Sequence, residues 1–336
     1  MSAIVAAAAN AAESTVNDVD PYPTRVSAPA VFPRQEPILW HKHQQGHVAN
    51  ANLRKSGDRQ QRVSAQLLAD FERDGYVFLP GVFSGDEVAE LRAELERLKA
   101  HCARHKPEEA FFERGTDALR SLFFVQKYSQ RFAEVARDPR LLDPVEAILD
   151  DDVYLHQSRV NYKPAYTGKE FFWHSDFETW HAEDGMPRMR AVSASIVLTS
   201  NSPLNGPLML IPGSHRYFVS CIGETPQDHY RHSLVRQELG TPDHETLNWL
   251  VEQGGVDMPT GPEGSVLLFD CNVMHASNSN VSPYPRSNLF FVYNAVSNAS
   301  VEPFAAKAPR PPFVGAREVV PLRVSGSESA PAQRGR

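Results

Sequence analysis

The change from helical to strand-like patterning begins at the stretch VYLHQSRVNY, residues Val153–Tyr162. Short apolar or alternating runs of this kind recur from here onward, separated by turn clusters such as NSPLNGP (residues 201–207). Many short strands divided by Gly- and Pro-rich turns are typical of a sandwich or barrel. The further runs are Ala191–Leu198, Leu208–Ile211, Val266–Phe269 and Leu289–Val296. We therefore predict a double-stranded β-helix core, of the jelly-roll or cupin-like kind, from about residue 153.

The residues before this core carry helical patterns. Ser84 and Glu87 have the spacing of a capping box, and apolar residues at helical spacing follow them. Ser64 can cap another helix, which Gly75 can end. Further helices are expected at Phe123–Ala136 and Leu141–Leu149, and a short strand at Tyr76–Leu79. The fold class is therefore mainly β, with flanking helices on one face.

The composition is that of a globular protein. Of 336 residues, 41% are hydrophobic and 22% are charged, so the chain can form a packed core. We expect one domain over residues 21–322, with a disordered extension at 1–20 and a disordered tail at 323–336, both biased in composition. Pro21–Pro37 is Pro-rich and should run extended over the body of this domain.

Charge and hydropathy limit the partners. A net charge of −7 argues against nucleic acid, and no apolar run approaches the ~20 residues that span a bilayer. The three cysteines are widely spaced without a CxxC, which is unlike a disulfide framework or a zinc knuckle. We therefore expect a cytoplasmic protein without a membrane or nucleic-acid partner.

A metal site is indicated by His174, Asp176 and His275. His174 and Asp176 are two residues apart, so at a strand end both side chains can point to one side. His275 follows another apolar stretch about a hundred residues later, which a β-core can bring beside them. Two imidazoles and one carboxylate form the facial triad that holds non-haem Fe(II) and leaves coordination positions open.

Arg286, eleven residues after His275, adds a second chemical requirement. A guanidinium fork matches carboxylate geometry, so this arginine suits a dicarboxylate co-substrate. Together these residues indicate an oxygenase that uses iron, dioxygen and 2-oxoglutarate. The non-enzymatic alternative is a metal-binding cupin-like sensor, which would have no need of Arg286 or of an open coordination position.

The remaining histidines are assigned other roles. His156 lies on a predicted strand and should be packed and hydrogen-bonded, and His215 should be structural, near a turn. His181 is close to the metal segment but should not be a ligand, because the triad is already complete. Solvated positions are expected for His41, His43, His47, His101, His105, His229, His232 and His244.

A longer segment narrows the function. The run FFWHSDFETWHAEDGMP, residues 171–187, resembles almost residue for residue the diagnostic segment of the ectoine hydroxylases, which belong to the phytanoyl-CoA dioxygenase-like family. Residues 205–215 and 224–230 are similar to two further segments of these enzymes, and the likeness extends from about Asp20 to Val320. The metal triad is shared by the superfamily, whereas the seventeen-residue run points to one substrate class.

The resemblance implies hydroxylation of ectoine to 5-hydroxyectoine, with decarboxylation of 2-oxoglutarate to succinate and CO2. It also implies a homodimer. By the family pattern, iron is bound by His174, Asp176 and His275. The 2-oxoglutarate residues would be Lys163, Asn161, Arg286 and Ser277, with Trp173 and Ser195 as further candidates. The ectoine site would be lined by Gln157, Thr179, Trp180, Phe269, Asn288 and Phe290.

The chemistry of ectoine agrees with these assignments. Its delocalised amidinium prefers an aromatic face, which Trp180, Phe269 and Phe290 could supply. Its carboxylate needs donors, and Gln157 and Asn288 are neutral ones. Gln157, Asn161 and Lys163 alternate on one strand, so all three could face the expected barrel interior. The segment Glu178–Gly185 is a candidate lid over the substrate. The rival enzyme is a related oxygenase acting on proline or another small substrate.

Overall fold

The computed structural model describes residues 20–40, 59–113, 115–235 and 239–324. Its strands are β1 (Ala30–Pro33), β2 (Tyr76–Leu79), β3 (Ala110–Phe112), β4 (Leu119–Phe123), β5 (Val153–Lys163), β6 (Phe171–His174), β7 (Ala191–Val197), β8 (Leu208–Leu210), β9 (Tyr217–Ser220), β10 (Val266–Asp270), β11 (His275–Ser277) and β12 (Arg286–Ala295). Its helices are α3 (Ala65–Asp74), α4 (Gly85–His105), α5 (Val125–Tyr128), α6 (Gln130–Val135), α7 (Pro139–Leu149), α8 (Asp176–Thr179), α9 (Tyr230–Ser233) and α10 (His244–Gly254). A π-helical turn, η2 (Trp180–Asp184), and two short 3-10 turns, η3 (Ser214–Arg216) and η4 (Val296–Asn298), complete the elements.

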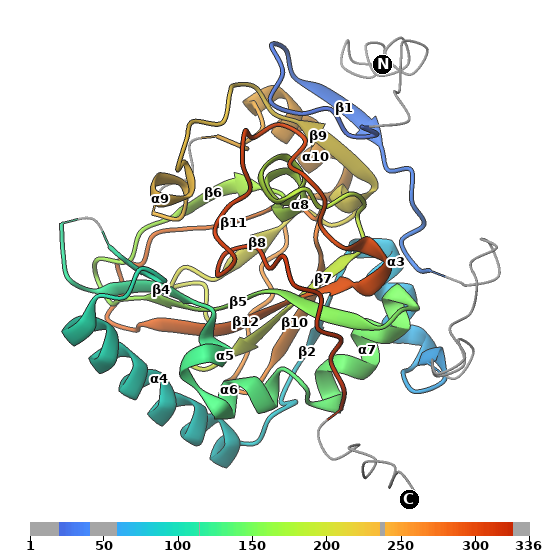
Figure 1. Cartoon of the computed structure of the whole chain (residues 1–336). Coiled ribbons are helices and arrows are strands. Elements are labelled where there is room, and N and C mark those ends of the chain that lie inside the picture. Colours follow the sequence, from blue (N-terminus) through green and yellow to red (C-terminus); the bar gives the residue numbers. More distant parts are fainter. Residues whose placement is uncertain (1–19, 41–58, 114, 236–238, 325–336) are drawn as a thin grey trace, which may run out of the picture.

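The largest sheet is antiparallel, with the strand order β2-β10-β7-β12-β5-β4-β3. Strands β6, β11 and β8 form a second sheet, which lies above the large one in Figure 1. This is the double-stranded β-helix that the sequence predicts. All five strands predicted in the core are present, and the last of them, β12, begins at Arg286, three residues before the predicted start.

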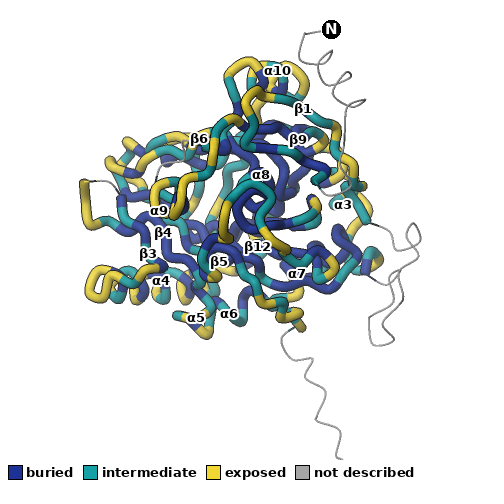
Figure 2. The backbone as a smooth tube through the Cα atoms, turned by 45° about the horizontal axis from the view of Figure 1, so that its top comes forward, coloured by how far each residue is buried: buried dark blue, intermediate teal, exposed yellow. Residues whose placement is uncertain are grey.

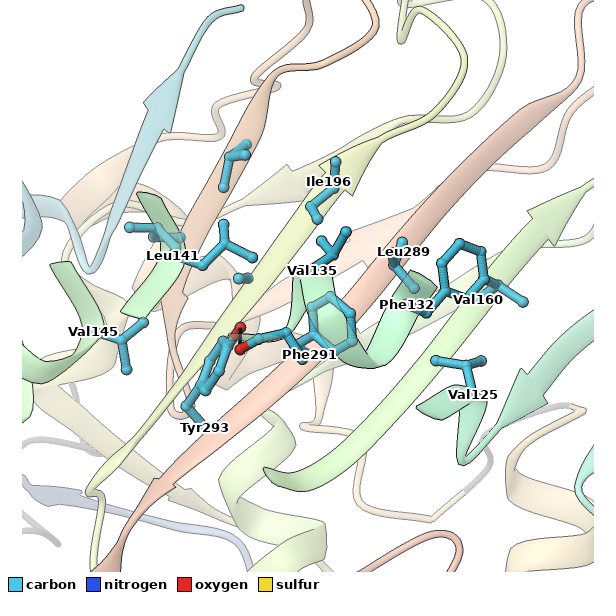
Figure 3. Close-up of a cluster of buried hydrophobic side chains, with 14 of the residues drawn as sticks. Val125, Phe132, Val135, Leu141, Val145, Val160, Ile196, Leu289, Phe291 and Tyr293 are labelled. Carbon is cyan, nitrogen blue, oxygen red and sulfur yellow. Dashed lines mark hydrogen bonds between the residues drawn. The ribbon is translucent and has the colours of Figure 1, made fainter. Parts of the chain in front are cut away.

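The two faces of the large sheet are covered differently. Because side chains alternate along a strand, Leu289, Phe291 and Tyr293 of β12 point to one face, where α4, α6 and α7 cover them (Figures 1 and 3). The Tyr293 hydroxyl donates a hydrogen bond to the Ala136 carbonyl oxygen at 3.0 Å. The central strands are buried, whereas the outer side of α4 is exposed (Figure 2). The other face of the sheet is therefore free to form a cavity with β6 and β11.

The helix boundaries follow the predicted caps. The Ser84 side chain accepts from the Glu87 amide at 3.3 Å, and the Glu87 carboxylate accepts from the Ser84 amide at 2.8 Å, which completes the capping box. Ser64 caps α3, and Gly75 ends it in a left-handed conformation with φ of 83°. The helix predicted after Pro139 and the strand ending before Pro80 are also confirmed.

The single helix predicted over Phe123–Ala136 is wrong. Phe123 ends β4, and Phe124 has a left-handed backbone with φ of 56°. Two short helices follow, because Ser129 leaves the helical region at φ −143° and its side chain caps α6. A serine at this position supports a new N-terminus better than a helix interior.

The N-terminal described segment runs extended, as the Pro-rich composition predicts, and its strand β1 pairs antiparallel with β9. Most of the two ends predicted to be disordered, residues 1–19 and 325–336, lie outside the described residues, as do His41, His43 and His47. No helix among the described residues is long and apolar enough to cross a membrane. All three cysteines are buried free thiols.

Candidate metal centre

The predicted metal ligands converge at the edge of the second sheet. His174 is the last residue of β6 and lies directly opposite His275, the first residue of β11, in the antiparallel register. Asp176 begins α8 two residues later, after Ser175 has capped that helix. One ligand atom from each of the three residues lies within 4.8 Å of the others. The structure therefore brings the triad together, as the spacing predicts.

Local hydrogen bonds orient both imidazoles. His174 Nδ1 donates to the Phe172 carbonyl oxygen at 2.7 Å, and His275 Nδ1 donates to the Val273 carbonyl oxygen at 3.0 Å. These bonds fix the tautomer and leave each Nε2 with a lone pair for a metal. Burial and the neighbouring His275 lower the pKa of His174 to about 4, so its ring is neutral at ordinary pH.

The donor set fits Fe(II). Asp176 Oδ2 is buried and has no hydrogen-bond partner among the described residues, which is costly unless a cation binds there. No fourth histidine, cysteine or carboxylate of the described chain joins the cluster. A structural zinc site would need four closed ligands, whereas two imidazoles and one carboxylate match an iron centre with open positions.

Two buried cations face each other beside this centre. Arg286 and Lys163 are directly opposite in the β12–β5 register, and their exposed fractions are 2% and 3%. Like charges in such a pair destabilise a sheet. Neither forms an ion pair with a carboxylate of the described residues: Arg286 Nη1 donates to the Gly206 carbonyl oxygen at 2.5 Å, and Lys163 Nζ donates to Ser277 Oγ at 2.9 Å. Arg286 Nε has no partner there either.

The pKa values of Lys163 and Arg286 are both lowered, because each side chain is buried near other positive groups. Burial, with Arg286 and Arg120 close by, lowers the pKa of Lys163 to about 6. Burial and Arg120 lower the pKa of Arg286 to about 10. A carboxylate placed between the two groups would reduce both penalties. The pair therefore has the electrostatics of a dicarboxylate site next to the metal ligands.

The cavity joins the two parts of the site. It is lined by the triad and by several residues predicted for co-substrate and substrate, which are Gln157, Asn161, Thr179, Trp180, Ser277, Arg286 and Phe290. Lys163 lies behind Ser277, to which it is bonded. Gln157 and Asn161 of β5 do line the cavity, as alternation along the strand predicts.

Three of the predicted residues lie around the cavity rather than in its lining. Ser195 and Asn288 are buried and bonded to each other, with Asn288 Nδ2 donating to Ser195 Oγ at 2.9 Å. The Phe269 ring packs edge-on against His275 with ring centroids 5.3 Å apart, so it supports a metal ligand from behind.

Trp173 is placed elsewhere. It precedes His174 on β6, so strand alternation turns it to the opposite face, where it packs against the cluster of Ile211 and Met274. A role for Trp173 in holding 2-oxoglutarate is therefore not supported by its position. The same alternation that places His174 could have excluded Trp173 from the sequence alone.

Several cavity residues were missed, and three of them are basic. Arg159 also faces inward from β5, where its guanidinium lies 4.8 Å from the centre of the Phe290 ring and donates to Gln157 Oε1. Alternation along β5 could have found it. His229 was expected to be solvated, but it is 8% exposed and lines the cavity. Arg310 comes from the irregular C-terminal segment, and no pattern in the sequence indicates it.

The segment Glu178–Gly185 is a buried wall, not an exposed lid. It continues α8 as the π-turn η2, and every residue from Trp180 to Asp184 is buried. Arg310 Nε donates to Asp184 Oδ1 at 2.8 Å, and His156 Nε2 donates to Asp184 Oδ2 at 3.1 Å, which confirms His156 as a packed, bonded histidine. His181 is confirmed outside the metal cluster, with Nδ1 donating to the Met186 carbonyl oxygen at 2.8 Å.

Known proteins match nearly the whole chain. The phytanoyl-CoA dioxygenase (PhyH) family matches residues 71–288. The ectoine dioxygenase of Bordetella bronchiseptica is 49% identical over 300 residues, covering 89% of this chain and 93% of the relative. The ectoine dioxygenase of Halomonas elongata is 50% identical over 298 residues, covering 88% and 85%. The crystal structure of EctD from S. alaskensis with 2-oxoglutarate and 5-hydroxyectoine has 42% identity and a TM-score of 0.76, covering 91% of this chain and 97% of that one. The same enzyme with bound Fe matches equally well, at 43% identity.

Proposed function

The chain belongs to the phytanoyl-CoA dioxygenase family and groups with its ectoine dioxygenases, and from this premise we propose that it hydroxylates ectoine to 5-hydroxyectoine. The enzyme is an Fe(II)- and 2-oxoglutarate-dependent dioxygenase. One observation carries the proposal: an open two-histidine, one-carboxylate cluster with an unpartnered Asp176 oxygen lies beside two buried basic side chains, Lys163 and Arg286, that have no carboxylate partner among the described residues.

The triad would hold Fe(II) through His174 Nε2, His275 Nε2 and the Asp176 carboxylate. Bound iron supplies the activation of dioxygen, while 2-oxoglutarate is decarboxylated to succinate and CO2. The protein contributes the placement of both imidazoles and the neutral state of His174. The carbonyl groups that accept from each Nδ1 keep both rings in position, and Phe269 packs edge-on against His275.

Arg286 and Lys163 would hold 2-oxoglutarate by its far carboxylate. Arg286 offers a planar fork with an unused Nε, and Lys163 offers a point charge behind Ser277. Asn161 Oδ1 already accepts from Ser121 Oγ at 2.9 Å, so its amide hydrogens are directed away from that bond and remain as donors. Ser195 and Asn288, bonded to each other, would support this group from the neighbouring strands.

Ectoine would occupy the space between Trp180, Phe290 and Thr179. The two rings suit the delocalised amidinium, and the Glu183 carboxylate, which also lines the cavity, can accept from its N–H groups. The guanidinium of Arg310 is a fitting partner for the ring carboxylate. The Gln157 amide donates to the Val314 carbonyl oxygen at 2.6 Å and accepts from Arg159, so it would order the cavity and not act as a free donor.

The test measures coupling. Protein loaded anaerobically with Fe(II) receives 2-oxoglutarate, dioxygen and ectoine, and succinate and 5-hydroxyectoine are quantified together. Equal amounts of the two products support the proposal. Succinate formed without loss of ectoine, or faster turnover of proline in a parallel reaction, would favour the rival oxygenase. No succinate with any substrate would favour a metal-binding sensor.

Two further expectations are proposals of the same kind. We propose a homodimer, which light scattering of the purified protein tests, because a mass near that of one chain would exclude it. We also propose a cytoplasmic location, supported by three cysteines that are all free thiols. Fractionation of cells that express the protein tests this location.

A further inference from the structure

The cavity wall contains a π-helical turn, η2, that continues from the helix of the metal ligand Asp176. In such a turn, residues five apart lie on one face, and π-turns are frequent at functional sites. Glu183 lies in this turn, Glu178 lies five residues earlier in α8, and both are 1% exposed. Two buried carboxylates on one face repel each other unless they share a cation. The turn therefore needs a positive group behind it.

Arg25 supplies that group from the N-terminal segment. Its Nε donates to Glu178 Oε1 at 2.9 Å, and its Nη2 donates to Glu178 Oε2 and to Glu183 Oε1, both at 3.1 Å. The Arg25 side chain is 2% exposed. Thr24 Oγ1 adds a hydrogen bond to Glu178 Oε1 at 2.6 Å. One planar guanidinium thus joins Glu178 of α8 to Glu183 of the π-turn η2, which a lysine ammonium on a flexible stem cannot reproduce.

The bridge lies directly behind the substrate side of the cavity. Thr179 at the end of α8 and Trp180 and Glu183 of η2 all line the cavity. A Cβ on Gly240, where φ is +72°, would lie 2.6 Å from Glu178 Oε2 and 3.1 Å from Arg25 Nη2. The backbone at Gly240 therefore packs on the bridge and closes it off. The 2-oxoglutarate side is built on β5, β11 and β12 instead.

We propose that Arg25 is a positioning residue for the substrate ring: by bridging Glu178 and Glu183 it fixes the orientation in which Trp180 and the Glu183 carboxylate meet the substrate. The inference rests on the proposed function, because it assumes a cationic ring in this cavity. The proposal predicts that removal of Arg25 affects the substrate site and leaves the iron and 2-oxoglutarate sites unchanged. Loss of the bridge weakens binding of ectoine and misplaces it, while the iron and 2-oxoglutarate sites keep their own supports.

The experiment compares Arg25→Lys and Arg25→Gln with the matched control Arg34→Lys. Arg34 belongs to the same N-terminal segment and is also buried, with Nη1 donating to Asp270 Oδ2 at 2.8 Å and Nη2 to the Met189 carbonyl oxygen at 2.6 Å. Neither of its partners lines the cavity. The readouts are KM for ectoine and for 2-oxoglutarate, the ratio of 5-hydroxyectoine to succinate, and calorimetric binding of ectoine without dioxygen.

Arg25→Lys is expected to raise KM for ectoine about tenfold or more, because misplacement of a bound ring is costly. The product ratio should fall, and KM for 2-oxoglutarate should not change. An unchanged ectoine KM in Arg25→Lys, or an equal rise in Arg34→Lys, would overturn the proposal. If the Arg25→Gln variant does not fold, the Arg25→Lys variant still tests the positioning role of Arg25. Turnover of ectoine by the unmodified enzyme, measured in parallel, separates failure of this inference from failure of the proposed function.

Discussion

Binding of 2-oxoglutarate should protonate the Lys163 side chain. Its pKa in the ligand-free protein is about 6, against an ordinary value of 10.5, because the side chain is buried and faces Arg286. At pH 7.5 only about 3% of these side chains carry the charge. A carboxylate placed beside the ammonium raises the pKa again, because an opposite charge favours the protonated form. Binding at pH 7.5 should therefore take up about one proton.

The sign of the pH dependence follows from this shift. The bound state holds the proton and the free state does not, so affinity for 2-oxoglutarate should fall by about tenfold for each pH unit above 6. As the pH falls through 6, the free lysine becomes charged and the linkage fades. At pH 5.5 about three-quarters of the side chains are already protonated, which leaves an uptake of about a quarter of a proton.

Calorimetry in buffers of different ionisation enthalpy measures this uptake directly. The slope of the observed binding enthalpy against buffer ionisation enthalpy gives the number of protons. Lys163→Met should bind 2-oxoglutarate more weakly and without uptake, and Lys163→Arg, whose guanidinium stays charged, should also bind without it. No uptake in the unmodified protein at pH 7.5, or equal uptake in both variants, would refute the argument from burial and charge.

Two pairs of substitutions test the metal centre and the cavity wall. His275→Ala should abolish binding of Co(II), followed by its absorbance, and leave the fold intact, whereas His181→Ala should keep metal binding and lose about 2–4 kcal/mol of unfolding free energy in urea. The reverse pattern would contradict the ligand assignment. Gly185→Ala should destabilise by about 3 kcal/mol, because φ is +74° and the new Cβ would lie 2.1 Å from a backbone carbonyl oxygen. Gly81→Ala, with φ of +62° and open space, should lose only about 1–2 kcal/mol, and equal losses would contradict the steric argument.

Local patterns predicted the parts of the fold that local physics controls. Ser64 and Ser84 cap helices because their side chains satisfy backbone amides within three residues, a requirement visible in sequence. The core strands were found by their apolar alternation. The first residues of β12 were not, because Arg286, Ser287 and Asn288 are polar, so the strand resembles a loop until Leu289.

The site was predictable where spacing or alternation constrains it. His174 and Asp176 follow from one strand end, and Gln157 and Asn161 from alternation along β5, which also contains the missed Arg159. Trp173 was misplaced because resemblance outweighed that same alternation. His229 carried no periodic pattern, and a polar neighbourhood in sequence does not predict burial by segments far along the chain.

The sequence by itself determined the β-helix, the metal triad and the family, because these depend on residue types at fixed short spacings and on a seventeen-residue run. Only the tertiary structure decided which charged side chains have a partner of opposite charge and which have none. Lys163 and Arg286 face each other through strand register, Arg25 reaches Glu178 and Glu183 across the fold, and Arg310 arrives from an irregular segment. Electrostatic and packing energies depend on distance and burial in space, and separation along the chain does not fix either of them.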